Sequence, residues 1–333
     1  MGLPALTGCE GGEGMIRYVV RRILFLIPII IAVSFIVFAL MDLAPGSVIN
    51  TVRVDMLTQE QMEEMIIAFN LDKPMIYRYG LYMVNLLQGD LGKSEQTQLD
   101  VWGLYISRLP NTLVLALASI VFGAAVGIPL GIIAARHAGT LIDNAVTFIS
   151  LIGMSMPSFW LGLILIIQFT LTWKWLPTGG NSAGFRSVIL PGICCGFMLM
   201  ATCSRQTRSS MLEVLRADYL RTARAKGVPE KLVVRKHALG NAWIPILTTL
   251  GATLSQSIAG SAIIESVFAW PGVGRMVIEA VNNRDVTTAM GSVILTSVLY
   301  VLIQLVVDLM YSFVDPRIKS QFANTSGKRR VAT

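Results

Sequence analysis

Six long stretches without a charged side chain are the feature that most limits how this sequence can fold. A helix that crosses a bilayer needs roughly 20 predominantly apolar residues, and each stretch approaches or exceeds that length. We therefore predict an all-α membrane protein with six transmembrane helices. The stretches that lack Asp, Glu, Lys and Arg are 23–41, 109–135, 144–173, 187–204, 238–264 and 286–307.

The overall composition agrees with a membrane location and excludes other classes. Only 14% of the residues are charged and 54% are apolar, whereas an average soluble domain has roughly 25% charged and 45–50% apolar residues. An ordinary soluble protein and a disordered chain are therefore excluded. The net charge of +7 does not by itself indicate a nucleic-acid binder, because such a protein needs a folded basic face.

The distribution of Lys and Arg predicts the orientation in the membrane. If the N-terminus is cytoplasmic, two thirds of the 27 Lys and Arg residues fall in cytoplasmic segments, and half of those lie between residues 205 and 236. Cytoplasmic loops of membrane proteins carry such an excess of positive charge. We therefore expect both termini to be cytoplasmic.

The segments between the spans differ in length. In the long segment after the first helix, Met62, Ile66 and Phe69 share one face of an amphipathic helix, and the tyrosines near residues 77–82 indicate a second short helix at the membrane interface. The expected divisions are 1–14, a disordered N-terminal extension; 15–42, the first transmembrane helix; 43–108, an extracytoplasmic loop with amphipathic helices; 109–319, a five-helix transmembrane domain with a basic cytoplasmic loop at 205–241; and 320–333, a cytoplasmic tail.

Gly123, Gly127 and Gly131 form a GxxxGxxxG pattern on the second predicted span. Glycines at this spacing lie on one face of a helix and allow a second helix to approach closely. We expect a tight helix pair there, with no chemical role for the glycines.

The sequence contains no pattern typical of an enzyme or a metal site. Gly92, Lys93 and Ser94 resemble the end of a phosphate-binding loop, but Leu87 stands where the first glycine of that motif is required. HExxH and GxSxG are absent, and His137 and His237 both fall on the predicted cytoplasmic side. We therefore expect no catalytic residue, no metal site and no cofactor on this chain.

The basic loop at 205–241 is open to three interpretations. It is dense in Arg and Lys and is interrupted at Gly227 and Pro229. Such a loop can lie on anionic lipid, serve only as a solvated topology anchor, or dock on a cytoplasmic partner. Composition by itself favours the first two.

Several motifs along the chain resemble one family. Residues 218–227 read DYLRTARAKG and residues 237–242 read HALGNA, which resembles the EAA loop of permease subunits in bacterial ABC importers. The form of this loop is similar to that of the dipeptide/oligopeptide/nickel permease family. Further matching motifs are GDLG at 89–92, RLPNTL at 108–113, ESVFAWPGVG at 265–274, NRD at 283–285, and the segments 18–46 and 308–318.

The resemblance implies a set of partners and a coupling helix. Permeases of this family pair with a second, homologous permease, are driven by two cytoplasmic ABC ATPases that bind ATP and Mg²⁺, and receive substrate from an extracytoplasmic binding protein. The EAA loop would form a short helix seated on an ATPase. The resemblance therefore favours docking on a cytoplasmic partner over the lipid-binding and topology-anchor interpretations of the loop at 205–241. The implied coupling residues are Arg221, Thr222, Ala223, Arg224, Ala225, Lys226 and Gly227.

Polar and ionisable groups in or near the spans are candidates for the substrate path. Asp308 is the clearest; its alternatives are pairing with an arginine at a subunit interface and exposure at the membrane edge. Glu265 can face a cationic peptide terminus or have a structural role. The uncharged candidates are Gln168, Gln256 and Gln304, for which hydrogen bonding between helices is the alternative.

The predicted function is a permease subunit that forms half of the path for short peptides. Within the same family, a permease for nickel, a metal chelate or glutathione is the alternative. A stand-alone secondary transporter is the alternative from another class, but it usually carries charged residues near the middle of the membrane, and these spans carry almost none. A membrane-anchored scaffold would leave the EAA loop unexplained.

Overall fold

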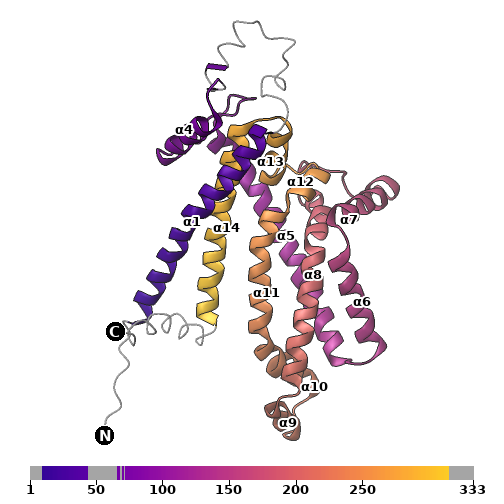
Figure 1. The fold of residues 1–333 in the computed structure, drawn as a ribbon. Coiled ribbons are helices and arrows are strands. Elements are labelled where there is room, and N and C mark those ends of the chain that lie inside the picture. The colour runs from indigo at the N-terminus through magenta and orange to yellow at the C-terminus, as the bar shows by residue number, and fades with distance from the viewer. Residues whose placement is uncertain (1–9, 44–65, 68–69, 71, 315–333) are drawn as a thin grey trace, which may run out of the picture.

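The computed structural model describes residues 10–43, 66–67, 70 and 72–314, and these residues are mainly helical (Figure 1). Among them, the one extended pairing is an isolated bridge between Lys93 and Asp100. The all-α prediction is confirmed. The helices are α1 (Glu10–Leu43), α4 (Met75–Leu87), α5 (Val101–Arg136), α6 (Leu141–Ser155), α7 (Ser158–Leu165), η2 (Ile166–Thr172), α8 (Phe185–Leu215), α9 (Asp218–Ala225), α10 (Glu230–Leu232), η3 (Val233–Ala238), α11 (Leu239–Gly260), α12 (Ala262–Val267), α13 (Val273–Asn282) and α14 (Val286–Val314).

The predicted segments at the two ends and in the long loop are described only in part. Helix α1 begins at Glu10, within the segment predicted as a disordered extension, and residues 1–9 lie outside the described residues. Most of the amphipathic helix predicted around residues 60–69, and the predicted tail at 320–333, also lie outside them. The second short helix predicted in this loop corresponds to α4.

Within the described residues, four helices are long and apolar enough to cross a membrane, and a fifth span results if one bent pair of helices is counted as a single span. The four are Arg22–Leu43, Val101–Arg136, Phe185–Leu215 and Val286–Met310. The fifth predicted span, 238–264, corresponds to α11, which is not among these four helices. Helix α8 continues well beyond the predicted 187–204, through Arg205 to Leu215.

The third predicted span, 144–173, is not one continuous helix. Helices α6 and α7–η2 meet at an angle of 102° across Met156 and Pro157. Proline lacks a backbone N–H, and its ring disfavours the helical conformation of the preceding residue. Met156 accordingly has an extended backbone, with ψ at 124°. The prediction of one helix over 144–173 was wrong.

Helices α1 and α14 pack side by side at one edge of the bundle (Figure 1). Arg22 of α1 forms an ion pair of 2.5 Å with Asp308 of α14. Further along α1, the hydroxyl group of Tyr79 from α4 donates to the carbonyl of Ile31 at 3.1 Å and lies 3.0 Å from the hydroxyl of Ser34. These contacts fix α4 against α1.

Helices α5 and α8 form the centre of the structure, and the glycine pattern lies between them. A Cβ atom on Gly127 would lie 2.6 Å from the carbonyl oxygen of Met200, and one on Gly131 would lie 2.5 Å from that of Ser204. On the facing helix, a Cβ atom on Gly196 would lie 2.6 Å from the backbone oxygen of Ser119. The predicted close approach of a second helix is confirmed.

Candidate functional site

The predicted coupling loop folds as the short helix α9, at the end of the bundle opposite α4 (Figure 1). Leu220 of α9 is fully buried in a hydrophobic cluster with Met211 of α8 and with Val233 and Ala238 of η3. Ala223 packs against the same cluster. Burial of a leucine side chain contributes roughly 1.5–3 kcal/mol. Helix α9 is therefore anchored to the bundle rather than attached through its chain ends alone.

Two of the basic residues in this loop form ion pairs within it. The guanidinium group of Arg224 donates to both carboxylate oxygens of Glu230, at 3.1 and 3.0 Å, and these hydrogen bonds hold the pKa of Glu230 below its usual value. Arg221 lies 3.5 Å from Asp218. Exposed ion pairs contribute only about 0–1 kcal/mol, so both arginines can exchange these carboxylates for those of another molecule at little cost.

The loop turns sharply after α9 at Gly227. Its φ of +76° lies in the left-handed region that favours glycine, and no heavy atom lies within 4 Å of the position that a Cβ atom would occupy. The side chains of Thr222, Ala225 and Lys226 are exposed. The outer surface of the loop therefore combines a small side chain with basic groups around a tight turn.

A further ion pair joins α6 to α8. Asp143, which is buried, accepts hydrogen bonds from Nε and Nη2 of Arg208 at 2.5 and 2.7 Å and from the backbone N–H of Gly139 at 2.9 Å. A bidentate arginine–carboxylate pair fixes the relative position of two elements better than a single contact does. The carboxylate thus connects the α5–α6 turn and α6 with α8, the helix that leads into α9.

Glu265, one of the candidates for the substrate path, is fully buried on α12. Its carboxylate accepts hydrogen bonds from the hydroxyls of Thr112 at 2.8 Å and Ser261 at 2.9 Å, and from the backbone N–H of Arg275 at 2.9 Å. A Cβ atom on Gly272 would overlap this carboxylate. In this conformation Glu265 connects α5, α12 and α13, and it does not face an open path.

The remaining charged candidate and its neighbour lie at the contact of α14 with α1. The side-chain amide of Gln304 donates to Asp308 at 3.1 Å, and Asp308 pairs with Arg22. The alternative for Asp308 was an arginine at a subunit interface, whereas the arginine that pairs with it here belongs to the same chain. Gln168 lies half-buried in the π-helical segment η2.

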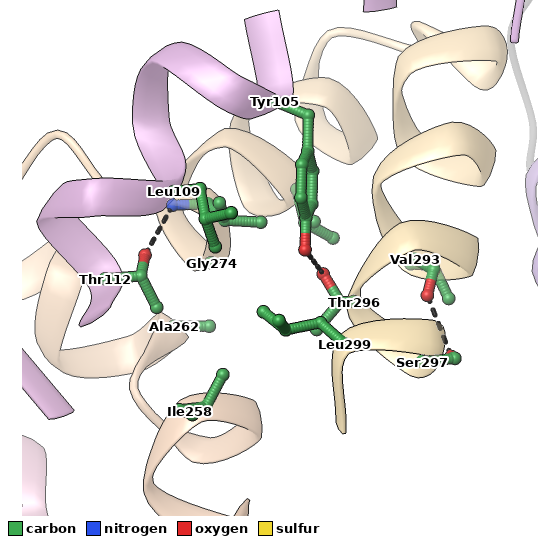
Figure 2. Close-up of a pocket in the computed structure, with 12 residues that line it drawn as sticks. Tyr105, Leu109, Thr112, Ile258, Ala262, Gly274, Val293, Thr296, Ser297 and Leu299 are labelled. Atoms are coloured by element: carbon green, nitrogen blue, oxygen red, sulfur yellow. Dashed lines mark hydrogen bonds between the residues drawn. The ribbon is translucent and has the colours of Figure 1, made fainter. Parts of the chain in front are cut away.

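Gln256 lines a cavity of about 400 Å³ between α8, α11 and the break that separates α6 from α7. A smaller cavity of about 180 Å³ lies between α5, α11, α13 and α14 (Figure 2). Its walls are mainly apolar, and in it the hydroxyls of Tyr105 and Thr296 lie 3.4 Å apart. Of the five path candidates, Gln256 is the one that lines either of these two cavities.

Two buried carboxylates near the α4 end of the bundle are not among the candidate site residues predicted from the sequence. Asp285 accepts hydrogen bonds from the hydroxyl of Ser94 at 2.5 Å and from the backbone N–H groups of Glu95 at 3.2 Å and Thr288 at 3.0 Å. The carboxylate of Glu95 in turn accepts from the hydroxyl of Thr287 at 3.0 Å. Burial, and secondarily the neighbouring Asp285, raise the pKa of Glu95 to about 7. The pair fastens the loop before α5 to the start of α14.

An acidic residue directly before a long apolar helix is a recognisable capping signal, and Asp285 could have been found in this way. No spacing rule points from Asp285 to Glu95, which lies 190 residues earlier. Among the described residues, no group of three or more His, Cys, Asp or Glu side chains could hold a metal ion.

Comparison with known families places most of the chain in two family models. The model described as "Binding-protein-dependent transport system inner membrane component" matches residues 127–320. A second model, for the N-terminal part of the membrane component of the same kind of transport system, matches residues 15–116. Together these ranges contain α9, two glycines of the pattern (Gly127 and Gly131) and all of the path candidates.

Similar curated proteins match over nearly the whole chain. A di/tripeptide transport system permease of Pseudomonas aeruginosa is 38% identical over 92% of this chain and 100% of its own length. An oligopeptide transport system permease of Bacillus subtilis is 36% identical with the same two coverages. A dipeptide transport system permease of Escherichia coli is 34% identical, and the match covers 92% of this chain and 99% of its own length.

A solved structure with a similar fold is the inward-facing MetNI methionine ABC transporter. The TM-score is 0.55 at 22% sequence identity, and the match covers 64% of this chain and 97% of the other. At this level of identity the likeness shows the fold alone.

Proposed function

Because this chain belongs to the family of binding-protein-dependent transport system inner membrane components, we propose that it is the permease subunit of an ATP-driven importer of short peptides. It is a multi-pass protein of the bacterial inner membrane. The names of the three relatives, which are permeases for dipeptides, tripeptides or oligopeptides, support peptides as the solute. No observation favours nickel, a metal chelate or glutathione as the solute, or a stand-alone secondary transporter.

A permease of this kind works with ATPase and substrate-binding partners. The assembly that we propose contains a second, homologous permease, two cytoplasmic ABC ATPases and an extracytoplasmic binding protein. ATP and Mg²⁺ are bound and ATP is hydrolysed on the ATPases, so this chain needs no catalytic residue or cofactor. The α9 end and both termini face the cytoplasm, which agrees with the excess of Lys and Arg between residues 205 and 236.

The anchored position of α9 is the observation that carries this proposal. When the two ATPases close on ATP, a helix seated on their surface moves with them. Because Leu220 joins α9 to α8 and η3, that movement is passed to α8 and α11 as a rigid-body shift between two states of the bundle. The proposed contact with the ATPase consists of residues 221–227.

The substrate path runs beside α8 and α11 in this proposal. Gln256 is the path candidate that lines the larger cavity, and an uncharged amide binds a passing peptide weakly enough to release it. Specificity then resides mainly in the binding protein. Glu265, Asp308, Gln304 and Gln168 would act on the path only after a rearrangement of the contacts described above.

The test compares two glycines that have similar backbones and no neighbours. Gly227 and Gly139 have φ of +76° and +78°, and neither has a heavy atom within 4 Å of a Cβ position. A Leu at either position carries a similar strain of roughly 1–2 kcal/mol. We expect Gly227→Leu to abolish coupling of ATP hydrolysis to peptide uptake in proteoliposomes that contain the assembled importer. Gly139→Leu, in the α5–α6 turn, should leave coupling intact.

If ATP hydrolysis remains coupled to peptide uptake in both variants, docking through this loop is refuted. Loss of coupling in both would show that strain at this end of the bundle, rather than contact with the ATPase, is responsible.

A further inference from the structure

The larger cavity contains one charged side chain. Its volume of about 400 Å³ lies within the range of roughly 300–1,000 Å³ that is usual for ligand pockets. Arg205 on α8 contributes the charge, and none of the described residues that line the cavity is acidic. The α8 wall consists of Cys194, Cys195, Met198, Leu199, Thr202 and Arg205, and the α11 wall consists of Thr253, Gln256 and Ser257.

Arg205 differs from the next arginine on the same helix. The guanidinium of Arg208 is held by the buried carboxylate of Asp143 through two hydrogen bonds. For Arg205, no ion pair or hydrogen bond of the guanidinium occurs within the part of the chain that the structure describes. A guanidinium presents several N–H donors in a planar fork that matches a carboxylate. The cavity therefore offers a carboxylate site that no side chain of the described residues fills.

The hydroxyls on the cavity walls can accept hydrogen bonds, whereas the guanidinium of Arg205 can only donate them. Thr202 donates to the carbonyl of Met198 at 3.0 Å, Thr253 to that of Thr249 at 2.8 Å, and Ser257 to that of Thr253 at 2.9 Å. A hydroxyl has one donor proton and two acceptor lone pairs. Because each proton is already used within its helix, these hydroxyls can only accept further hydrogen bonds, which suits an ammonium group.

We infer that this cavity is a transient binding site for zwitterionic short peptides, in which Arg205 receives the C-terminal carboxylate and the hydroxyls of α11 accept from the α-ammonium group. This inference rests on the proposed function. From Cys194 to Arg205, α8 rises about 16 Å at 1.5 Å per residue. An extended tripeptide spans about 10 Å at 3.3–3.6 Å per residue, so dipeptides and tripeptides are shorter than this wall of the cavity.

The experiment compares a dipeptide with its C-terminal amide, which has no carboxylate. ATP-driven uptake of both is measured in proteoliposomes that contain the assembled importer and its binding protein, for wild type, Arg205→Gln and Arg205→Lys. The control is Arg136→Gln, an exposed arginine at the same end of the bundle that does not line the cavity. Because the binding protein is the same in all samples, its own preference cancels when each variant is divided by wild type.

We expect Arg205→Gln to lower uptake of the free acid by about tenfold, which corresponds to about 1.4 kcal/mol, because the variant loses a hydrogen bond to a charged group. Uptake of the amide should change less than about twofold, which also shows that the variant is folded. Arg205→Lys should restore part of the difference, and Arg136→Gln should have no effect on it. An equal decrease for both peptides, or an equal effect of Arg136→Gln, would assign Arg205 to lipid anchoring or structure and overturn the inference. Absence of uptake by wild type would instead refute the proposed function, and this inference with it.

Discussion

The glycine seam between α5 and α8 gives a prediction whose size follows from the structure. Replacement of Gly131 by Ala would place a methyl group 2.5 Å from the carbonyl oxygen of Ser204 and 2.5 Å from Cβ of Thr207. Carbon atoms pack best at roughly 3.5–4.0 Å, so the two helices would have to separate by about 1 Å. The obstacle is partly backbone and cannot move aside as a flexible side chain can.

The expected cost follows from overpacking. Extra methyl groups in a well-packed core typically destabilise by about 1–3 kcal/mol, so we expect Gly131→Ala and Gly127→Ala each to lower stability by this amount. Gly123→Ala should cost less, because the nearest atoms belong to the side chain of Leu199, which can change its rotamer. The double variant of Gly127 and Gly131 should cost less than the sum, since one separation of the helices relieves both contacts.

The assay is thermal unfolding of the purified permease in detergent, followed by the loss of monodisperse protein. The matched control is Gly80→Ala in α4, where no heavy atom lies within 4 Å of the Cβ position. Alanine is favoured over glycine within a helix by roughly 1 kcal/mol, so this control should be neutral or stabilising. If Gly127→Ala and Gly131→Ala unfold at the same temperature as the control, the close packing of α5 on α8 is refuted.

Two further predictions concern buried carboxylates. The pKa of Glu95 is raised from 4.5 to about 7; the resulting stabilisation, about 3 kcal/mol, is therefore complete below pH 4.5 and is lost as the pH rises through 7. Glu95→Gln should flatten the dependence of melting temperature on pH between 5 and 8, and an unchanged slope would contradict this. Glu265→Ala would leave three donors, those of Thr112, Ser261 and Arg275, without their acceptor, at a cost of roughly 1–3 kcal/mol each. The alanine variant should therefore melt well below both wild type and Glu265→Gln. A wild-type melting temperature for the alanine variant would disprove the role of this carboxylate.

Sequence reasoning succeeded where the physics is local. Exclusion of charge over about 20 residues predicts a span whatever lies next to it, because the cost of placing charge in lipid depends on that segment itself. The same holds for the glycine pattern, whose three members share a face through helical periodicity, and for the loop motif at 218–227 that identified the family.

Sequence reasoning failed where one segment depends on another. Pro157 was visible in the sequence. Whether it would break the helix predicted over 144–173 depended on the neighbouring helices, which the sequence does not show. Asp308 was expected on a substrate path or an interface, and its partner Arg22 lies on α1. For Glu265 the sequence left a path role and a structural role open, and its partner Thr112 lies 153 residues earlier.

The sequence by itself determined that this chain is an all-α membrane protein, since the bilayer acts on each segment separately, and its motifs indicated the permease family. The tertiary structure alone decided which polar groups are satisfied and which remain available. That outcome depends on how each helix is rotated about its axis and on which helices meet. The same chemical type, an arginine, is neutralised by a buried carboxylate at Arg208 and lines an open cavity at Arg205, one turn away.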